Sequence, residues 1–94
     1  AVSYIMSKKY GKQRIAYNLM QKGIGKEIIE EAYFSIEEEY EKNIEDEKLE
    51  KAIEKNIKKE ENKLIQYLVR QGFSLNKVLS KYKEFKENND LEGE

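Results

Sequence analysis

Arg14-Ile15-Ala16-Tyr17-Asn18-Leu19-Met20-Gln21-Lys22-Gly23-Ile24 decides the fold, because a second version of this stretch follows in the same chain. The second version is Lys63-Leu64-Ile65-Gln66-Tyr67-Leu68-Val69-Arg70-Gln71-Gly72-Phe73, at an offset of 49 residues. The matched pairs are Ile15 and Leu64, Leu19 and Leu68, Met20 and Val69, Gly23 and Gly72, Ile24 and Phe73, Ile29 and Val78, and Tyr33 and Tyr82. A run of matched apolar positions around a matched glycine indicates a duplicated unit.

Each copy is predicted to form three helices, because its apolar residues recur at spacings of three and four. The first helix carries an apolar stripe that begins at Val2, and its counterpart begins at Leu49, at an offset of 47. The second helices are predicted over about 13–22 and 60–71. Gly23 and Gly72 should end them, since glycine tolerates the left-handed conformation just past a helix terminus. The third helices then begin after residues 25 and 74, and the earlier one reaches about residue 42.

The predicted fold class is therefore all-α. Two tandem three-helix, helix-turn-helix-like repeats would stack into an extended arc, right- or left-handed, because neither unit can bury its apolar surface alone. The first repeat is predicted over residues 1–42, with a truncated first helix, and the second over 43–87. Residues 88–94 are polar and aperiodic and are predicted to be a disordered tail. The abrupt start at Ala1 favours a piece of a longer chain.

Charge is distributed unevenly along the chain, although the net charge is only −1. Residues 1–26 contain six basic residues and no acid, residues 27–62 carry 14 acids against six bases, and residues 63–94 are nearly balanced. This division predicts one face for an anionic partner and another face that stays in water.

Several function classes are excluded or disfavoured by composition. The chain has no His and no Cys, so neither a Ser-His nor a Cys-His nucleophile can be built. We therefore expect no enzyme, no cofactor and no metal site, and the glutamates of residues 37–41 are interpreted as a solvated helix face. No apolar run is long enough to cross a bilayer, so no membrane association is expected.

The basic stretch Lys8-Lys9-Tyr10-Gly11-Lys12-Gln13-Arg14 is the most informative local feature. It is interpreted either as a surface for an anionic partner or as an ordinary lysine-rich loop kept for solubility. The partner could be nucleic acid or an acidic protein groove. Tyr10 and Tyr17 lie among these cations and could stack on bases of single-stranded nucleic acid, but Tyr10 could equally pack under the short first helix.

In its motifs the sequence resembles the RecX family of bacterial regulatory proteins. The first copy contains Leu19-Met20-Gln21-Lys22-Gly23-Ile24 after a basic lead-in, and then Ile28-Ile29-Glu30-Glu31-Ala32. The second copy contains Tyr67-Leu68-Val69-Arg70-Gln71-Gly72-Phe73-Ser74 followed by Val78-Leu79. The resemblance covers residues 1–86. Members of the family have three tandem three-helix units, and this chain resembles the middle and last of them.

The resemblance implies a function that composition does not. RecX proteins bind the RecA recombinase filament and inhibit its recombination and ATPase activities, which modulates DNA repair and the SOS response in the cytoplasm; some also bind single- or double-stranded DNA. The residues expected to face the filament or its DNA are Lys8, Lys9, Lys12, Arg14, Lys22 and Arg70. Two alternatives stay open, namely a helical protein that binds DNA directly and a generic helical adaptor for another protein.

Overall fold

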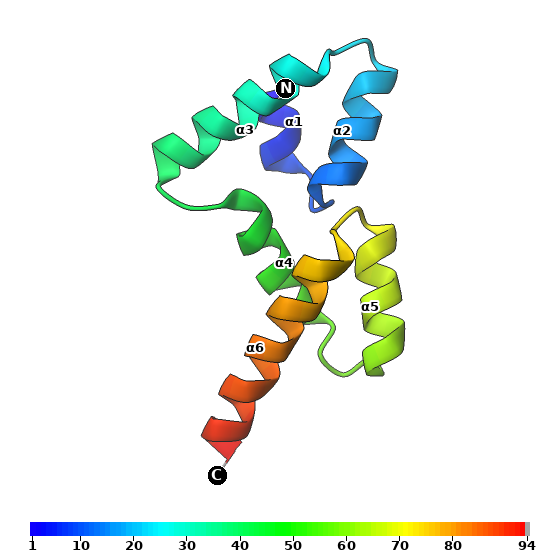
Figure 1. The fold of residues 1–94 in the computed structure, drawn as a ribbon, viewed down its shortest axis with the longest axis vertical. Helices are drawn as coiled ribbons and strands as arrows, with labels where there is room; N and C mark the ends of the chain where they lie inside the picture. Colours follow the sequence, from blue (N-terminus) through cyan, green and yellow to red (C-terminus); the bar gives the residue numbers. More distant parts are fainter. Residues whose placement is uncertain (94) are drawn as a thin grey trace.

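A computed structural model describes the backbone of residues 1–93 and the side chains as far as Asn88. It contains six helices and, within the described residues, no strand (Figure 1). The helices are α1 (Val2–Ser7), α2 (Lys12–Gln21), α3 (Lys26–Tyr40), α4 (Ile44–Lys55), α5 (Glu61–Arg70) and α6 (Leu75–Gly93). The predicted all-α class is confirmed.

The second helix of each copy ends in the same hydrogen-bonded cap. Gly23 and Gly72 have φ angles of +89° and +103°, as predicted from their position after α2 and α5. The amide of Ile24 donates to the carbonyl of Leu19 at 3.1 Å, and the amide of Phe73 donates to that of Leu68 at 3.2 Å. These bonds satisfy carbonyl groups that the helix leaves free, in the pattern known as the Schellman motif.

The two copies have separate apolar cores, each built from one set of matched residues. Tyr33 and Tyr82 are buried, as predicted. Three further matched pairs are fully buried, namely Ile15 and Leu64, Leu19 and Leu68, and Ile29 and Val78. The first core contains Ile5, Ile15, Leu19, Ile29, Ala32, Tyr33 and Ile36. The second contains Leu49, Ile53, Leu64, Leu68, Phe73, Val78 and Tyr82. The duplication in sequence is therefore a duplication of buried positions.

Some matched or striped apolar residues do not belong to these cores. Met20 and Val69 correspond at the offset of 49, yet they are 52% and 40% exposed. Ile28 and Leu79 also lie on the outer side of their helices. The helix period of 3.6 residues turns these positions away from the buried stripe. These apolar side chains therefore lie on the surface of the molecule, although they correspond between the two copies.

The register of the first helices differs from the predicted offset of 47. Ile5 is the buried residue of α1, and the equivalent buried residue of α4 is Ile53, at an offset of 48. The second copy therefore has one extra residue before its second helix, where the predicted offset gave two. Helix α4 also begins earlier relative to its core and has 12 residues, against six in α1.

Helices α3 and α4 are joined by a short, defined turn. Glu41 adopts a left-handed conformation with φ of 53° and ends α3. Asn43 caps α4, because its side-chain oxygen accepts a hydrogen bond from the amide of Asp46 at 3.0 Å. A cap of this kind satisfies one of the free amides at a helix start, so α4 begins directly after Asn43.

Residues 88–94 were predicted to form a disordered tail. Helix α6 continues through Gly93, and Glu94 lies outside the described residues. The segment after Asn88 contains no proline, which would stop a helix, and it extends a helix that is already formed. Propagating a helix costs far less than nucleating one.

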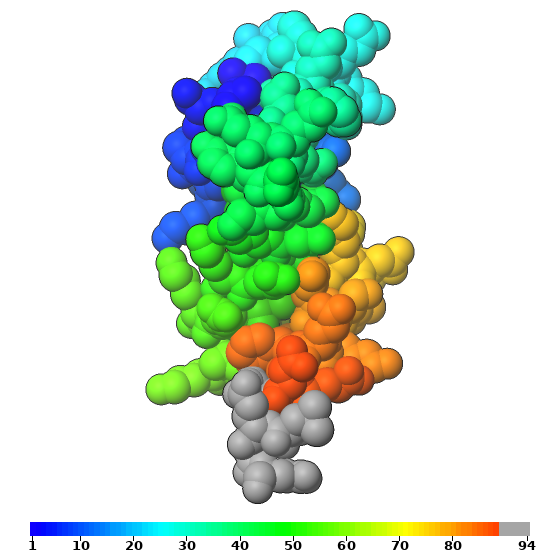
Figure 2. All heavy atoms as spheres, turned by 90° about the vertical axis from the view of Figure 1, so that its left-hand side faces the viewer, coloured from blue at the N-terminus to red at the C-terminus, as the bar shows by residue number. Residues whose placement is uncertain are grey.

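The molecule is elongated, with extents of 49 × 27 × 20 Å. The first copy and the second copy lie one above the other (Figure 1), and the blue N-terminal segment adjoins the green part of the chain that contains α3 and α4 (Figure 2). No described helix is both long and apolar enough to cross a membrane.

The copies are joined where the C-terminal end of α5 meets the N-terminal end of α2. The amide of Gly11 donates to the carbonyl of Gln71 at 2.8 Å, and the amide of Gln13 donates to that of Gly72 at 3.1 Å. The partial negative charge of one helix end thus faces the partial positive charge of the other. This junction sets the position of the basic residues described next.

Candidate partner-binding surface

Lys8 and Lys22 gather around one aromatic ring on the first copy. The Lys8 Nζ atom lies 5.4 Å from the ring centre of Tyr4, and the Lys22 Nζ atom lies 4.5 Å from it. Asn18 donates a hydrogen bond to the Tyr4 hydroxyl at 3.0 Å, which fixes the ring. Both lysines remain exposed. Tyr4 therefore holds two cations together on the outside of α1 and α2.

Lys12 has its charge partnered within the molecule. Its Nζ atom lies 3.3 Å from a carboxylate oxygen of Glu30 and 5.0 Å from the ring centre of Tyr33. Burial raises the pKa of the Tyr33 phenol, and the nearby carboxylate of Glu45 raises it further. The phenol therefore stays neutral at ordinary pH, and Lys12 contacts a neutral ring.

Arg14 belongs to the junction between the copies. Its guanidinium group lies 3.8 Å from the ring centre of Tyr10 and donates to the side-chain oxygen of Gln71 at 3.4 Å. Tyr10 packs against the first core. This contact agrees with the interpretation of Tyr10 as a packing residue and not as a base-stacking one. By contrast, Tyr17 is 63% exposed. The arginine side chain thus helps to hold α2 against the end of α5.

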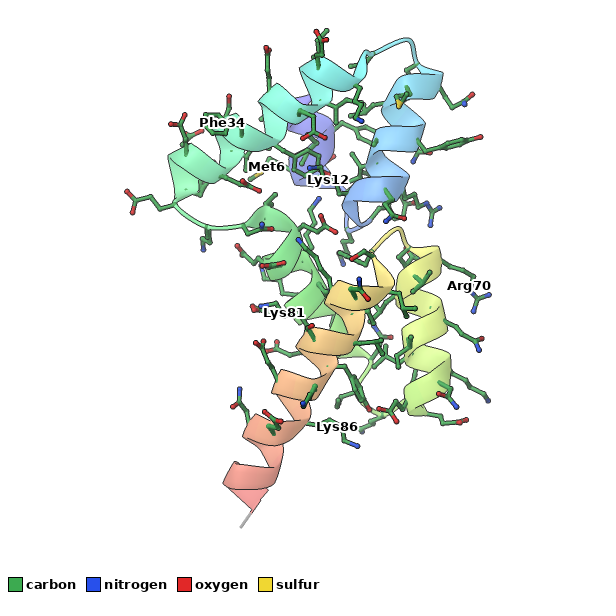
Figure 3. All side chains as sticks on the ribbon, viewed as in Figure 1. Met6, Lys12, Phe34, Arg70, Lys81 and Lys86 are labelled. Carbon is green, nitrogen blue, oxygen red and sulfur yellow. The ribbon has the colours of Figure 1, made fainter. Side chains whose placement is uncertain are left out.

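Arg70 and Lys9 are both exposed and lie on different parts of the surface. Arg70 points outward from α5, away from Lys12 (Figure 3). Lys9 lies beside Lys55 of α4 and lowers the pKa of Lys55, first through a side-chain hydrogen bond and then through like-charge repulsion. The structure therefore brings Lys8 and Lys22 together around Tyr4, but it does not gather all six predicted residues into one patch.

Three basic residues of α4 were missed because they belong to the acidic middle segment. Lys48, Lys51 and Lys55 share a pocket lining with Lys8 and Lys9. Their spacing of three and then four residues places them on one face of a helix, and this spacing was a usable signal. Averaging charge over residues 27–62 concealed it.

No cluster of potential metal ligands was found among the described residues. The carboxylate of Glu47, the only acid in the same pocket lining, is held by Lys42 and Lys51 at 3.5 and 3.1 Å. These two lysines lower the pKa of Glu47. The chemistry available on this surface is thus cation-based recognition of an anionic partner.

Together, these features define an all-α repeat protein with a basic surface on its first copy. Residues 2–32 match the second three-helix domain of RecX. The predicted resemblance to the RecX family is confirmed through this match, which covers α1, α2 and the first part of α3. RecX is a regulatory, non-enzymatic family. Comparisons with curated proteins and with solved structures gave no match.

Proposed function

We propose that this chain regulates the RecA recombinase by binding its nucleoprotein filament and inhibiting recombination and ATP hydrolysis. The observation that carries the proposal is the match of residues 2–32 to a RecX domain. Through this activity the protein would modulate DNA repair and the SOS response in the cytoplasm. The rest of the chain repeats the same three-helix architecture, with its own core.

The shape of the molecule supports a filament as the partner. Stacked three-helix units present a long, shallow surface instead of an enclosed cavity. The molecule is 49 Å long, and its two copies present equivalent helices one above the other. A partner with its own structural repeat can contact both copies in the same way.

The predicted basic residues differ in how much unpaired positive charge they expose to a partner. Lys8, Lys9, Lys22 and Arg70 are exposed, and we assign partner contact to them. Arg14 stabilises the junction and is assigned an indirect, supporting role. Lys12 is paired with a carboxylate, which reduces the charge that it presents to a partner.

The experiment is the ATPase activity of RecA on single-stranded DNA, measured with increasing amounts of this chain. The unmodified chain should inhibit at micromolar concentration, and the double variant Lys8→Glu, Lys22→Glu should inhibit less. The matched control is Lys63→Glu, Lys83→Glu, which changes net charge equally at exposed positions away from Tyr4. Absence of inhibition by the unmodified chain would contradict the proposal.

A second candidate function is direct binding to DNA, favoured by the acid-free first 26 residues. Binding through phosphates should weaken with salt, with a log–log slope near −0.9 for each phosphate neutralised on duplex DNA. Titration of labelled DNA with the isolated chain at several salt concentrations measures this slope. Inhibition of RecA without measurable DNA binding would favour the filament as the target.

A further inference from the structure

A groove between α1 and α4 combines an apolar lining with a concentration of lysines. Its volume is about 340 Å³, at the low end of the range of about 300–1,000 Å³ for ligand pockets. The apolar part is formed by Met6, Ile44 and Ala52. The charged part contains Lys8, Lys9, Lys48, Lys51 and Lys55. We call this the lysine groove.

Most of these lysines have no carboxylate within ion-pair distance. Lys51 is paired with Glu47 at 3.1 Å. Among the described side chains, Lys8, Lys9, Lys48 and Lys55 form no ion pair. The groove therefore carries an excess of positive charge that the molecule itself does not neutralise.

Lys48 is held in a fixed position at the inner side of the groove. Its Nζ atom donates a hydrogen bond to the backbone carbonyl of Ile5 at 2.6 Å, one of the carbonyl groups that the short helix α1 leaves free. The side chain is half-buried, and this burial lowers the pKa of Lys48 to about 8. A carboxylate entering the groove would favour the charged form of this lysine.

Exposed apolar surface distinguishes this groove from a simple basic patch. The side chain of Met6 is 40% exposed beside the lysines. Methionine adapts its shape to many apolar partners and is common at binding surfaces. Phosphate contacts use charged and polar donors and need no apolar anchor, and no aromatic residue lines the groove for a base to stack on. These features favour a protein segment over a nucleic acid.

We propose that the lysine groove binds an acidic peptide segment of a partner protein through one apolar anchor. The anchor side chain packs on Met6 and Ala52, and flanking carboxylates contact the adjacent ammonium groups of Lys9 and Lys55. Charge complementarity selects the acidic segment, and the apolar contact fixes its register. The proposal goes beyond binding to the RecA filament and does not depend on it.

The test is fluorescence anisotropy with a labelled synthetic peptide of Asp and Glu residues around one central Leu. The purified chain should bind this peptide at low salt. The same peptide with Gly in place of Leu should bind severalfold more weakly, because it lacks the apolar anchor. The chain variant Met6→Ser should bind both peptides equally, and at the weaker level.

Charge-reversal variants locate the site. Lys9→Glu, Lys55→Glu should weaken peptide binding about tenfold or more, since two attractive charges become repulsive. Lys63→Glu, Lys83→Glu makes the same change in net charge at exposed positions outside the groove and should retain most of the affinity. Circular dichroism of each variant checks that its helical content is unchanged.

Four results would overturn the proposal. The first is the absence of peptide binding, and the second is equal binding of the Leu and Gly peptides. The third is equal loss of affinity in the two charge-reversal variants. The fourth is tighter binding of a DNA oligonucleotide that Lys9→Glu, Lys55→Glu abolishes, since the groove would then serve nucleic acid. Because no RecA is present in this assay, its failure leaves the proposed regulatory function untouched.

Discussion

The backbone amide of Gln13 donates a hydrogen bond to the carbonyl oxygen of Gly72, at 3.1 Å. This bond joins the start of α2 in the first copy to the end of α5 in the second. A Cβ atom built on Gly11 would lie 2.4–2.5 Å from backbone atoms of Gly72 and Phe73. The copies thus meet through backbone atoms at a distance that excludes even a methyl group.

Gly11→Ala is expected to lower the free energy of unfolding, because the added methyl group overlaps the backbone of the second copy. Overpacking of this kind costs about 1–3 kcal/mol. Chemical denaturation of the variant measures the change. Gly25→Ala is the matched control, since both glycines occupy helix N-cap positions with a φ of −72° and Gly25 has no atom within 4 Å of its built Cβ. Equal loss in both variants would mean that the junction contributes nothing.

Gly72→Ala should cost more stability than Gly23→Ala. Both glycines have a positive φ angle, so both variants carry the left-handed strain of about 1–2 kcal/mol. Only at Gly72 does the new Cβ atom approach another residue, reaching 2.5 Å from the Cβ of Arg14, whereas Gly23 has open space. The difference between the two thermal unfolding midpoints measures the effect of the contact between residue 72 and Arg14 at the junction. Identical midpoints would contradict the assignment of this contact to the junction.

The half-buried Lys48 should make the free energy of unfolding depend on pH. Burial lowers its pKa from 10.5 to about 8, so between these pH values the unfolded chain binds more protons than the folded chain. This lysine therefore makes the free energy of unfolding rise as the pH increases above about 8. The variant Lys48→Met should lack this component of the rise, measured by urea denaturation.

The comparison for Lys48 needs a bounded pH range and a matched control. The raised pKa of Tyr33 acts in the opposite direction above its ordinary value of 10.0, because the unfolded phenol then ionises first. Measurements should therefore stay below that pH. Lys63→Met removes an exposed lysine from α5 and should retain the rise. A rise that persists unchanged in Lys48→Met would refute the assignment.

Tyr33→Phe should leave stability unchanged or increase it by up to about 1 kcal/mol. The Tyr33 hydroxyl is buried and has no hydrogen-bond partner among the described residues, and an unpaired buried polar group is unfavourable. The Phe ring keeps the packing and the contact with Lys12. Differential scanning calorimetry provides the measurement, with exposed Tyr17→Phe as the neutral control. A clear loss of stability in Tyr33→Phe, but not in Tyr17→Phe, would show that the Tyr33 hydroxyl forms a stabilising hydrogen bond.

The sequence was most informative about features that depend on nearby residues. The glycine caps followed from Gly23 and Gly72, because the left-handed conformation is a local requirement. Buried Tyr33 and Tyr82 followed from apolar spacing. The same spacing did not show that Met20 is exposed, because an apolar residue beside the buried stripe has the same hydrophobicity as one within it.

The candidate surface was predicted less completely. The basic stretch pointed to the first copy, whereas three lysines of the lysine groove come from α4 of the second copy. It did not show that Arg14 contacts Tyr10 and Gln71, or that Lys12 is paired with Glu30. These partners are distant along the chain, and sequence spacing carries no information about their distance in space.

By itself, the sequence determined the six helices, the glycine caps of α2 and α5 and the duplicated core, because helix formation and amphipathic burial depend on residues a few positions apart. Only the tertiary structure decided that Gly11 meets Gly72 and that Lys9 lies beside Lys55. These contacts join residues separated by about half the chain or more. Their geometry follows from how the two cores pack against one another, which no local pattern encodes.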